Sequence, residues 1–138
     1  MLKAFMIVLV LLLYVFPAAA QENQAPPKGA IPADAAQQVN PVKATSESLA
    51  QGKKYYGYDC AMCHGANGDG KGEVAVEEKL KLADFSDPAT LKGKTDGELF
   101  YIIKQGHDHM PPEGDRLKAP ELWNLVNYVR SLSSKKGQ

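Results

Sequence analysis

The chain has 138 residues, with 16 lysine or arginine residues against 16 acidic ones, and two cysteines. This length suits a single folded domain, and the balanced charge argues against nucleic acid, whose phosphates select for basic surfaces. Two cysteines exclude a disulfide-rich scaffold and any four-cysteine zinc or iron–sulfur site within the chain. They leave one disulfide, a redox pair, part of a mixed metal site, or a cofactor attachment.

The first 20 residues have the pattern of an export signal. Lys3 precedes an apolar run over residues 4–16, and Pro17 leads into three alanines that suit a cleavage site. The apolar run is shorter than the roughly 20 residues that a membrane-spanning helix needs. We therefore expect residues 1–20 to be a Sec signal peptide and the mature protein to be periplasmic. The alternative is an uncleaved anchor that tethers the protein to the membrane.

Residues 21–45 are rich in proline, alanine and glutamine, and their apolar residues follow no regular period. Such a composition buries too little apolar surface to offset the entropy of ordering the chain. We therefore expect a disordered linker over residues 21–45, followed by the folded domain over residues 46–138.

Three helices are predicted in this domain. The first, over residues 46–60, begins with a serine, a residue favoured at helix N-caps. The second, over residues 95–106, begins with the S/T-x-x-E capping-box pattern and ends at a glycine. The third, over residues 120–132, opens with Pro-Glu, which suits a first helical turn, and carries an apolar stripe.

The remaining segments of the domain indicate loops rather than strands. Residues 65–88 contain many glycines and are mostly loop, with one short helix expected near residues 74–81. No segment alternates in polarity as a strand does, so the fold class is all-α, with three to five helices and long loops. Because so small a helical domain buries a thin core by itself, we expect a cofactor to fill its centre.

Residues 60–64 read Cys-Ala-Met-Cys-His, the C-x-x-C-H signature of covalent haem attachment. Two thiols at this spacing can each add to one vinyl group of the same porphyrin, which forms two thioethers. The next residue is then held with a ring nitrogen toward the iron. The motif therefore predicts one covalently attached haem c, bound through Cys60 and Cys63, with His64 as an axial ligand of the iron.

A redox disulfide and a zinc site are the alternatives for the two cysteines. A thioredoxin-like C-x-x-C disulfide occurs in a βαβ context, which this sequence lacks. A zinc site that used His107 and His109 would need histidines about three to five residues apart, whereas these are two apart. Export also favours haem, because c-type haem is attached outside the cytoplasm.

The chain resembles the class I c-type cytochromes over residues 46–132. The resemblance rests on five stretches, at residues 60–65, 68–72, 82–85, 106–111 and 121–129. It implies the cytochrome c fold around one covalently bound haem. It also implies that the first and last helices cross near Gly52, with Tyr56 and Tyr128 packed around the crossing.

The resemblance implies that Met110, in a loop before the last helix, is the second axial ligand. Elimination agrees, because Met62 lies inside the attachment motif and the other two methionines lie in the leader. His107 and His109 remain alternative second ligands, which would give a bis-histidine centre of lower potential.

One feature of the family is missing. Many relatives carry a proline after the attachment histidine, whose carbonyl accepts the free N–H of that ring. Here no proline occurs between His64 and Pro88. Because ligating histidines almost always donate their other N–H, some other acceptor is expected.

A haem iron held by histidine and methionine has no open position, and the thioether sulfur raises its potential. We therefore expect an electron carrier rather than an enzyme, passing single electrons between redox protein partners such as an oxidase, a reductase or a dehydrogenase. The alternatives are a haem c subunit of a larger membrane or periplasmic oxidoreductase and, less favoured, a haem peroxidase or gas-binding sensor. We expect no nucleic-acid partner, and membrane contact only if the N-terminal segment stays uncleaved.

Overall fold

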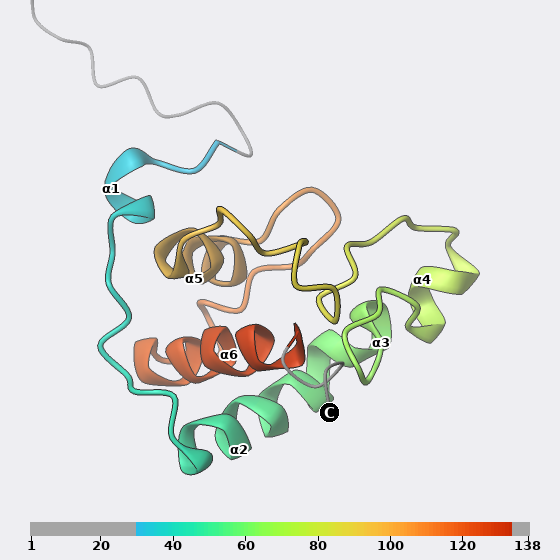
Figure 1. Cartoon of the computed structure of the whole chain (residues 1–138). Coiled ribbons are helices and arrows are strands. Elements are labelled where there is room, and N and C mark those ends of the chain that lie inside the picture. The colour runs from blue at the N-terminus through green and yellow to red at the C-terminus, as the bar shows by residue number, and fades with distance from the viewer. Residues whose placement is uncertain (1–29, 134–138) are drawn as a thin grey trace, which may run out of the picture.

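The computed structural model describes residues 30–133 (Figure 1), so the predicted signal peptide and the start of the predicted linker lie outside the described residues. The elements are, in chain order, α1 (Ala33–Ala36), α2 (Ser46–Tyr55), the π-helical turn η1 (Tyr56–Cys60), α3 (Ala61–His64), α4 (Glu73–Glu77), α5 (Asp96–Gln105) and α6 (Ala119–Leu132). Over residues 30–133 no strand forms beyond an isolated bridge between His107 and Met110, which confirms the all-α fold class. No helix within this range is long and apolar enough to cross a membrane.

The three predicted helices form where the sequence places them. The first is α2 with η1, and its N-cap is Thr45, whose side chain accepts the N–H of Ser48 at 3.2 Å. The capping box of α5 is complete, because Thr95 and Glu98 each accept the backbone N–H of the other. The short helix α4 ends earlier than expected, since Lys79 adopts a left-handed φ of 54°.

Helix α6 lies between α2 and α5 and forms the centre of the core (Figure 1). At its crossing with α2, a Cβ added to Gly52 would lie 2.1 Å from the carbonyl oxygen of Asn124. The rings of Tyr56 and Tyr128 meet there with centroids 5.2 Å apart, as the family resemblance implies. The fully buried side chains with the largest volumes are Tyr56, Leu122, Leu125, Leu132 and Val126.

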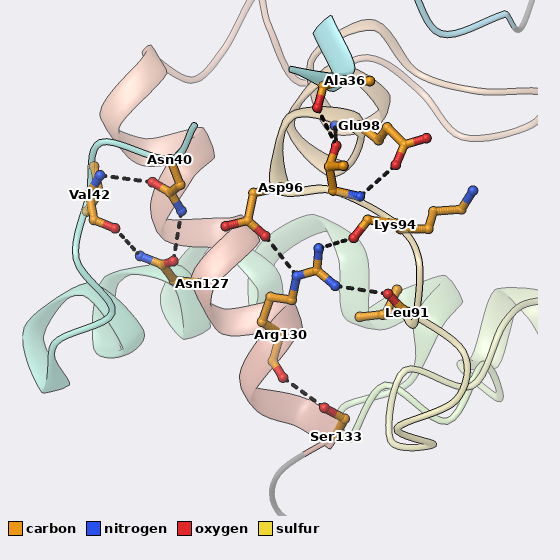
Figure 2. Close-up of polar contacts among 11 residues, drawn as sticks. Ala36, Asn40, Val42, Leu91, Lys94, Asp96, Glu98, Asn127, Arg130 and Ser133 are labelled. Atoms are coloured by element: carbon orange, nitrogen blue, oxygen red, sulfur yellow. Dashed lines mark hydrogen bonds and ion pairs between the residues drawn. The ribbon is translucent and has the colours of Figure 1, made fainter. Parts of the chain in front are cut away.

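Residues 30–45, which we call the N-terminal strap, pack on the domain, so the expectation of a disordered linker is wrong for this part. The strap runs from α1, beside α5, to the start of α2 (Figure 1). The Thr95 hydroxyl donates to the carbonyl of Ala36 at 2.7 Å. The side-chain amide of Asn127 donates to the carbonyl of Val42 at 3.0 Å and accepts from Asn40 at 2.8 Å (Figure 2).

The strap is held mainly by polar contacts. Such contacts produce no regular spacing of apolar residues, so the sequence does not reveal them. Ala35 is its buried residue, at 3% exposure. A Cβ on Gly97 would lie 2.1 Å from the Ala35 carbonyl oxygen, so the strap sits directly on the backbone of α5 because this glycine has no side chain. Its ordering therefore depends on partners far away in the sequence.

Arg130 of α6 fastens the loop that precedes α5 (Figure 2). Its guanidinium donates to the carboxylate of Asp96 at 2.8 Å and to the carbonyl of Leu91 at 3.0 Å. It also donates to the carbonyl of Lys94 at 2.5 Å. Five fixed donors on one planar group suit this simultaneous contact with a carboxylate and two carbonyls.

Candidate functional site

The attachment motif lies where the long helical run α2–η1–α3 ends. Cys60 closes the π-helical turn, and Cys63 and His64 belong to α3. Both thiols are free and half-buried. Residues three apart on a helix lie on the same face, so the two thiols face the same side. π-Helical turns inside α-helices are frequently found at functional sites.

The glycine-rich loop after α3 folds back against the motif. Gly65 ends the helix with a φ of 78°, a conformation that L side chains rarely adopt. The N–H of Gly70 then donates to the carbonyl of His64 at 2.9 Å, and that of Gly72 to Cys63 at 3.0 Å. These two hydrogen bonds fix the backbone of the attachment motif. The glycines that donate them lie in residues 68–72, one of the stretches that carry the family resemblance.

The ring of His64 is held by aromatic stacking. It lies on the ring of Phe85, with centroids 4.8 Å apart and the two planes 23° from parallel. Burial lowers the pKa of His64 and so favours the neutral imidazole, which is the form that binds metals. Its Nδ1 is buried and has no hydrogen-bond partner among the described residues.

These residues fit a covalently attached haem. Two free thiols at the C-x-x-C spacing stand beside a neutral imidazole whose ring nitrogen is buried and unsatisfied. The fit rests on the two thiols at the attachment spacing and on the neutral imidazole that directly follows them, while the orphaned Nδ1 is the atom that the expected carbonyl acceptor would satisfy. The carbonyl that replaces the missing proline acceptor is not identified by the contacts of the described residues.

The Cys60 thiol lies among charged side chains. Its pKa is raised to about 12, chiefly by burial and then by the negative charges of Glu113 and Asp59, while Arg116 lowers it. Within residues 30–133, moreover, no group of three or more His, Cys, Asp or Glu side chains could hold a metal ion.

The loop over residues 106–118, which we call the Met110 loop, begins with a tight backbone turn. His107 and Met110 exchange two backbone hydrogen bonds, of 3.1 and 2.7 Å, around Asp108 and His109. Asp108 adopts a φ of 49°. A Cβ on Gly106 would lie 2.6 Å from the Met110 carbonyl oxygen, so the turn closes tightly against this glycine.

The three candidates for the second ligand differ in where their side chains lie. Met110 is half-buried and packs against the hydrophobic core, as do Cys60 and Phe85. His107 is half-buried, with its Nδ1 3.3 Å from the carboxylate of Asp108. His109 is exposed. The structure thus brings Met110 to the same core as the attachment segment.

Sequence reasoning missed a charged cluster beside the site. Arg116 lies between the carboxylates of Asp59 and Glu113 and contacts both. Glu113 is only 6% exposed, which is unusual for a carboxylate and requires such a partner. The available signal was the spacing of Glu113 and Arg116, which allows an ion pair within one turn, but it did not point to Asp59.

Comparison with known proteins agrees with the geometry of the site. Residues 47–129 match the family described as "Cytochrome C oxidase, cbb3-type, subunit III". Cytochrome c6 of Cladophora glomerata is 32% identical over 84 residues, covering 61% of this chain and 88% of that protein. Cytochrome c6 of Synechococcus sp. is 27% identical over 92 residues, covering 67% of this chain and 77% of that protein.

A solved structure shares the fold of the chain. It belongs to the reducing HAO-like protein complex of Kuenenia stuttgartiensis, with a TM-score of 0.59 and 29% sequence identity. The alignment covers 67% of this chain and 46% of the other, so the present chain spans less than half of its solved relative.

Proposed function

The chain belongs to the cbb3-type cytochrome c family, and we propose that it is an exported carrier of single electrons whose haem iron is ligated by His64 and Met110. It is a monohaem class I c-type cytochrome with the cytochrome c fold, and its cofactor is covalently bound haem c. Its role is haem-based electron transfer. Three further points are proposals: ligation of the iron by His64 and Met110, redox proteins as partners, and export to the periplasm.

The observation that supports this ligand set best is the shared packing of Met110 and Cys60 on one core. Both residues contact the one hydrophobic cluster of the domain, so Met110 faces the core against which the attachment segment also packs. The exposed side chain of His109 would have to leave solvent, whereas His107 is half-buried and its Nδ1, 3.3 Å from the Asp108 carboxylate, makes no hydrogen bond among the described residues. The geometry therefore favours Met110 over His109, and His107 stays the alternative to test.

Each residue of the site has a role in this proposal. Cys60 and Cys63 hold the porphyrin, and the stacking of Phe85 keeps the ring of His64 in one orientation. If Met110 ligates the iron, its thioether sulfur would favour the reduced state and would leave no open position for an external ligand. When bound, haem c supplies a one-electron iron couple. A closed site that changes little between the two oxidation states suits electron transfer.

The surface near the motif suits a brief encounter with a redox protein. Met62, between the two cysteines, is 55% exposed, and Tyr58 is 64% exposed. Contiguous apolar surface, rather than single apolar side chains, marks interaction sites, and these two residues are candidates because both lie in or beside the attachment motif. We propose oxidases, reductases or dehydrogenases in the periplasm as partners, which dock weakly through a small apolar surface. Membrane contact is proposed only if the N-terminal segment stays uncleaved.

The ligand set can be tested on purified protein with its haem attached. We expect the oxidised wild-type protein to show the weak red band of sulfur–iron coordination, and Met110→Ala to lose this band and gain rapid CO binding after reduction. His109→Ala is the matched control, because this exposed histidine should leave both properties unchanged. A red band that persists in Met110→Ala, or an oxidised wild-type protein without one, would contradict the proposal.

A haem c subunit of a larger oxidoreductase is the second candidate. It is favoured by the matched family, described as a subunit, and by the structural relative, which belongs to a protein complex. Size-exclusion chromatography of native protein from its source separates the two candidates. A free carrier elutes as a small monomer, whereas a subunit elutes with its complex.

A further inference from the structure

Arg116 joins the loop that carries Met110 to the segment that carries the first haem cysteine. Its Nη2 donates to Oε2 of Glu113 at 2.8 Å and to Oδ2 of Asp59, and its Nε donates to the same Glu113 oxygen at 3.2 Å. Glu113 follows Met110 by three residues, and Asp59 directly precedes Cys60. The guanidinium thus bridges two segments that are far apart in the sequence.

The backbone N–H groups of residues 113–114 in the Met110 loop form hydrogen bonds to helix α5. The N–H groups of Glu113 and Gly114 donate to the carbonyls of Ile103 and Lys104 in α5, at 3.0 Å each. These bonds hold the loop to α5. Arg116 adds a connection to the helical run that carries the attachment motif, because Asp59 belongs to η1. A movement of the loop away from this run must separate Arg116 from Asp59.

The two halves of the bridge differ in exposure, because the Arg116–Glu113 pair is partly buried whereas the Arg116–Asp59 pair is exposed. Glu113 is buried, and a buried carboxylate that loses the cation that pairs with it is left with a large desolvation cost. Charge-assisted hydrogen bonds from a planar guanidinium are among the stronger polar contacts in proteins. The charges also lie within reach of the site, since Glu113 and Asp59 raise the pKa of the Cys60 thiol while Arg116 lowers it, after the larger effect of burial.

We propose that Arg116 is a positioning residue, which holds the Met110 loop closed by bridging Asp59 and Glu113 and thereby protects the Met110–iron bond from external ligands. The inference rests on the proposed ligation by His64 and Met110. An external ligand can bind only in the fraction of molecules whose loop has released Met110. The apparent affinity for that ligand therefore measures the open fraction.

Imidazole binding to the oxidised protein, with its haem attached, tests the inference. We expect Arg116→Gln to bind imidazole about tenfold more tightly than the wild type, because loss of the bridge raises the open fraction by that factor. Asp59→Asn should raise the affinity in the same direction, since it removes the other end of the bridge. This second variant keeps the test decisive if Arg116→Gln folds poorly.

Arg130→Gln is the matched control. Arg130 also contacts one carboxylate and two backbone carbonyls, but it fastens the loop before α5 rather than the Met110 loop. We expect this variant to lose thermal stability and to keep the wild-type imidazole affinity. A merely structural role for Arg116 predicts the same behaviour for both arginine variants.

The possible results separate this inference from the proposed function. Unchanged imidazole affinity in Arg116→Gln and Asp59→Asn, or an equal rise in Arg130→Gln, overturns the role of Arg116. In either case a red sulfur–iron band in the wild-type protein leaves the His64 and Met110 ligation standing. Absence of that band from the wild type overturns the ligation itself, and the inference with it.

Discussion

The two ends of the helical run α2–η1–α3 are held in different ways. The α2 end crosses α6 at Gly52, where helix backbone, the Tyr56 and Tyr128 rings and a buried hydrogen bond from Asn127 to Ser48 fill the interface. The α3 end is surrounded by loops, and its cysteines and histidine are only half-buried. Protein atoms alone fill the interface at the α2 end. The α3 end instead carries two thiols and an imidazole that fit a covalently attached haem.

This difference separates stability from chemistry along one continuous helical run. Apolar area removed from water stabilises the crossing, with about 25 cal/mol for each Å². At the other end, hydrogen bonds of glycine backbones, a stacked ring and the Arg116 bridge fix the geometry. Substitutions at the crossing should therefore lower the free energy of unfolding most, and substitutions toward the site should have smaller effects on it.

The largest effect is expected from Gly52→Ala. The added Cβ would lie 2.1 Å from the Asn124 carbonyl oxygen and 2.7 Å from Cβ of Tyr128, so the two helices must move apart. We expect a loss of about 3 kcal/mol in the free energy of unfolding, measured by chemical denaturation.

Gly57→Ala is the control for this substitution. No atom lies within 4 Å of a Cβ added at Gly57, and its φ is not positive. We expect no loss, and a gain of up to about 1 kcal/mol from the better helix propensity of alanine. Equal losses in the two variants would show that the crossing is not the tight contact described above.

A smaller effect is expected from Tyr56→Phe, which removes a link between the two regions. The Tyr56 hydroxyl donates to the carbonyl of Gly65 at 2.8 Å, and burial raises its pKa, so that it remains a donor. We expect a loss of about 1.5 kcal/mol in the free energy of unfolding, since a buried hydrogen bond is lost while the Gly65 carbonyl keeps the N–H of Gly68 at 3.0 Å. The exposed Tyr58, changed to Phe, should have almost no effect, and a similar loss there would refute this reading.

The smallest effect is expected from Gly97→Ala, which pushes the N-terminal strap away from α5. The added Cβ would lie 2.1 Å from the Ala35 carbonyl oxygen. Because the strap buries little apolar surface, we expect a loss of only about 1 kcal/mol in the free energy of unfolding. Limited proteolysis should cut residues 30–45 faster than in the wild type. Unchanged cleavage would mean that the strap does not need this close contact.

The sequence by itself determined the parts of the protein that depend on neighbouring residues. Helix caps and apolar periods act within a few positions. The three helices that depend on them, α2, α5 and α6, were therefore predicted correctly. The attachment motif is also local, because its two cysteines must reach vinyl groups of one porphyrin.

Only the tertiary structure decided the contacts between distant residues. The strap is ordered by Thr95 and Asn127, whose partners lie 59 to 87 residues away. The bridge from Arg116 to Asp59 spans 57 residues. A hydrogen bond or ion pair between such positions leaves no period or spacing in the sequence, because its geometry exists only once the helices have packed.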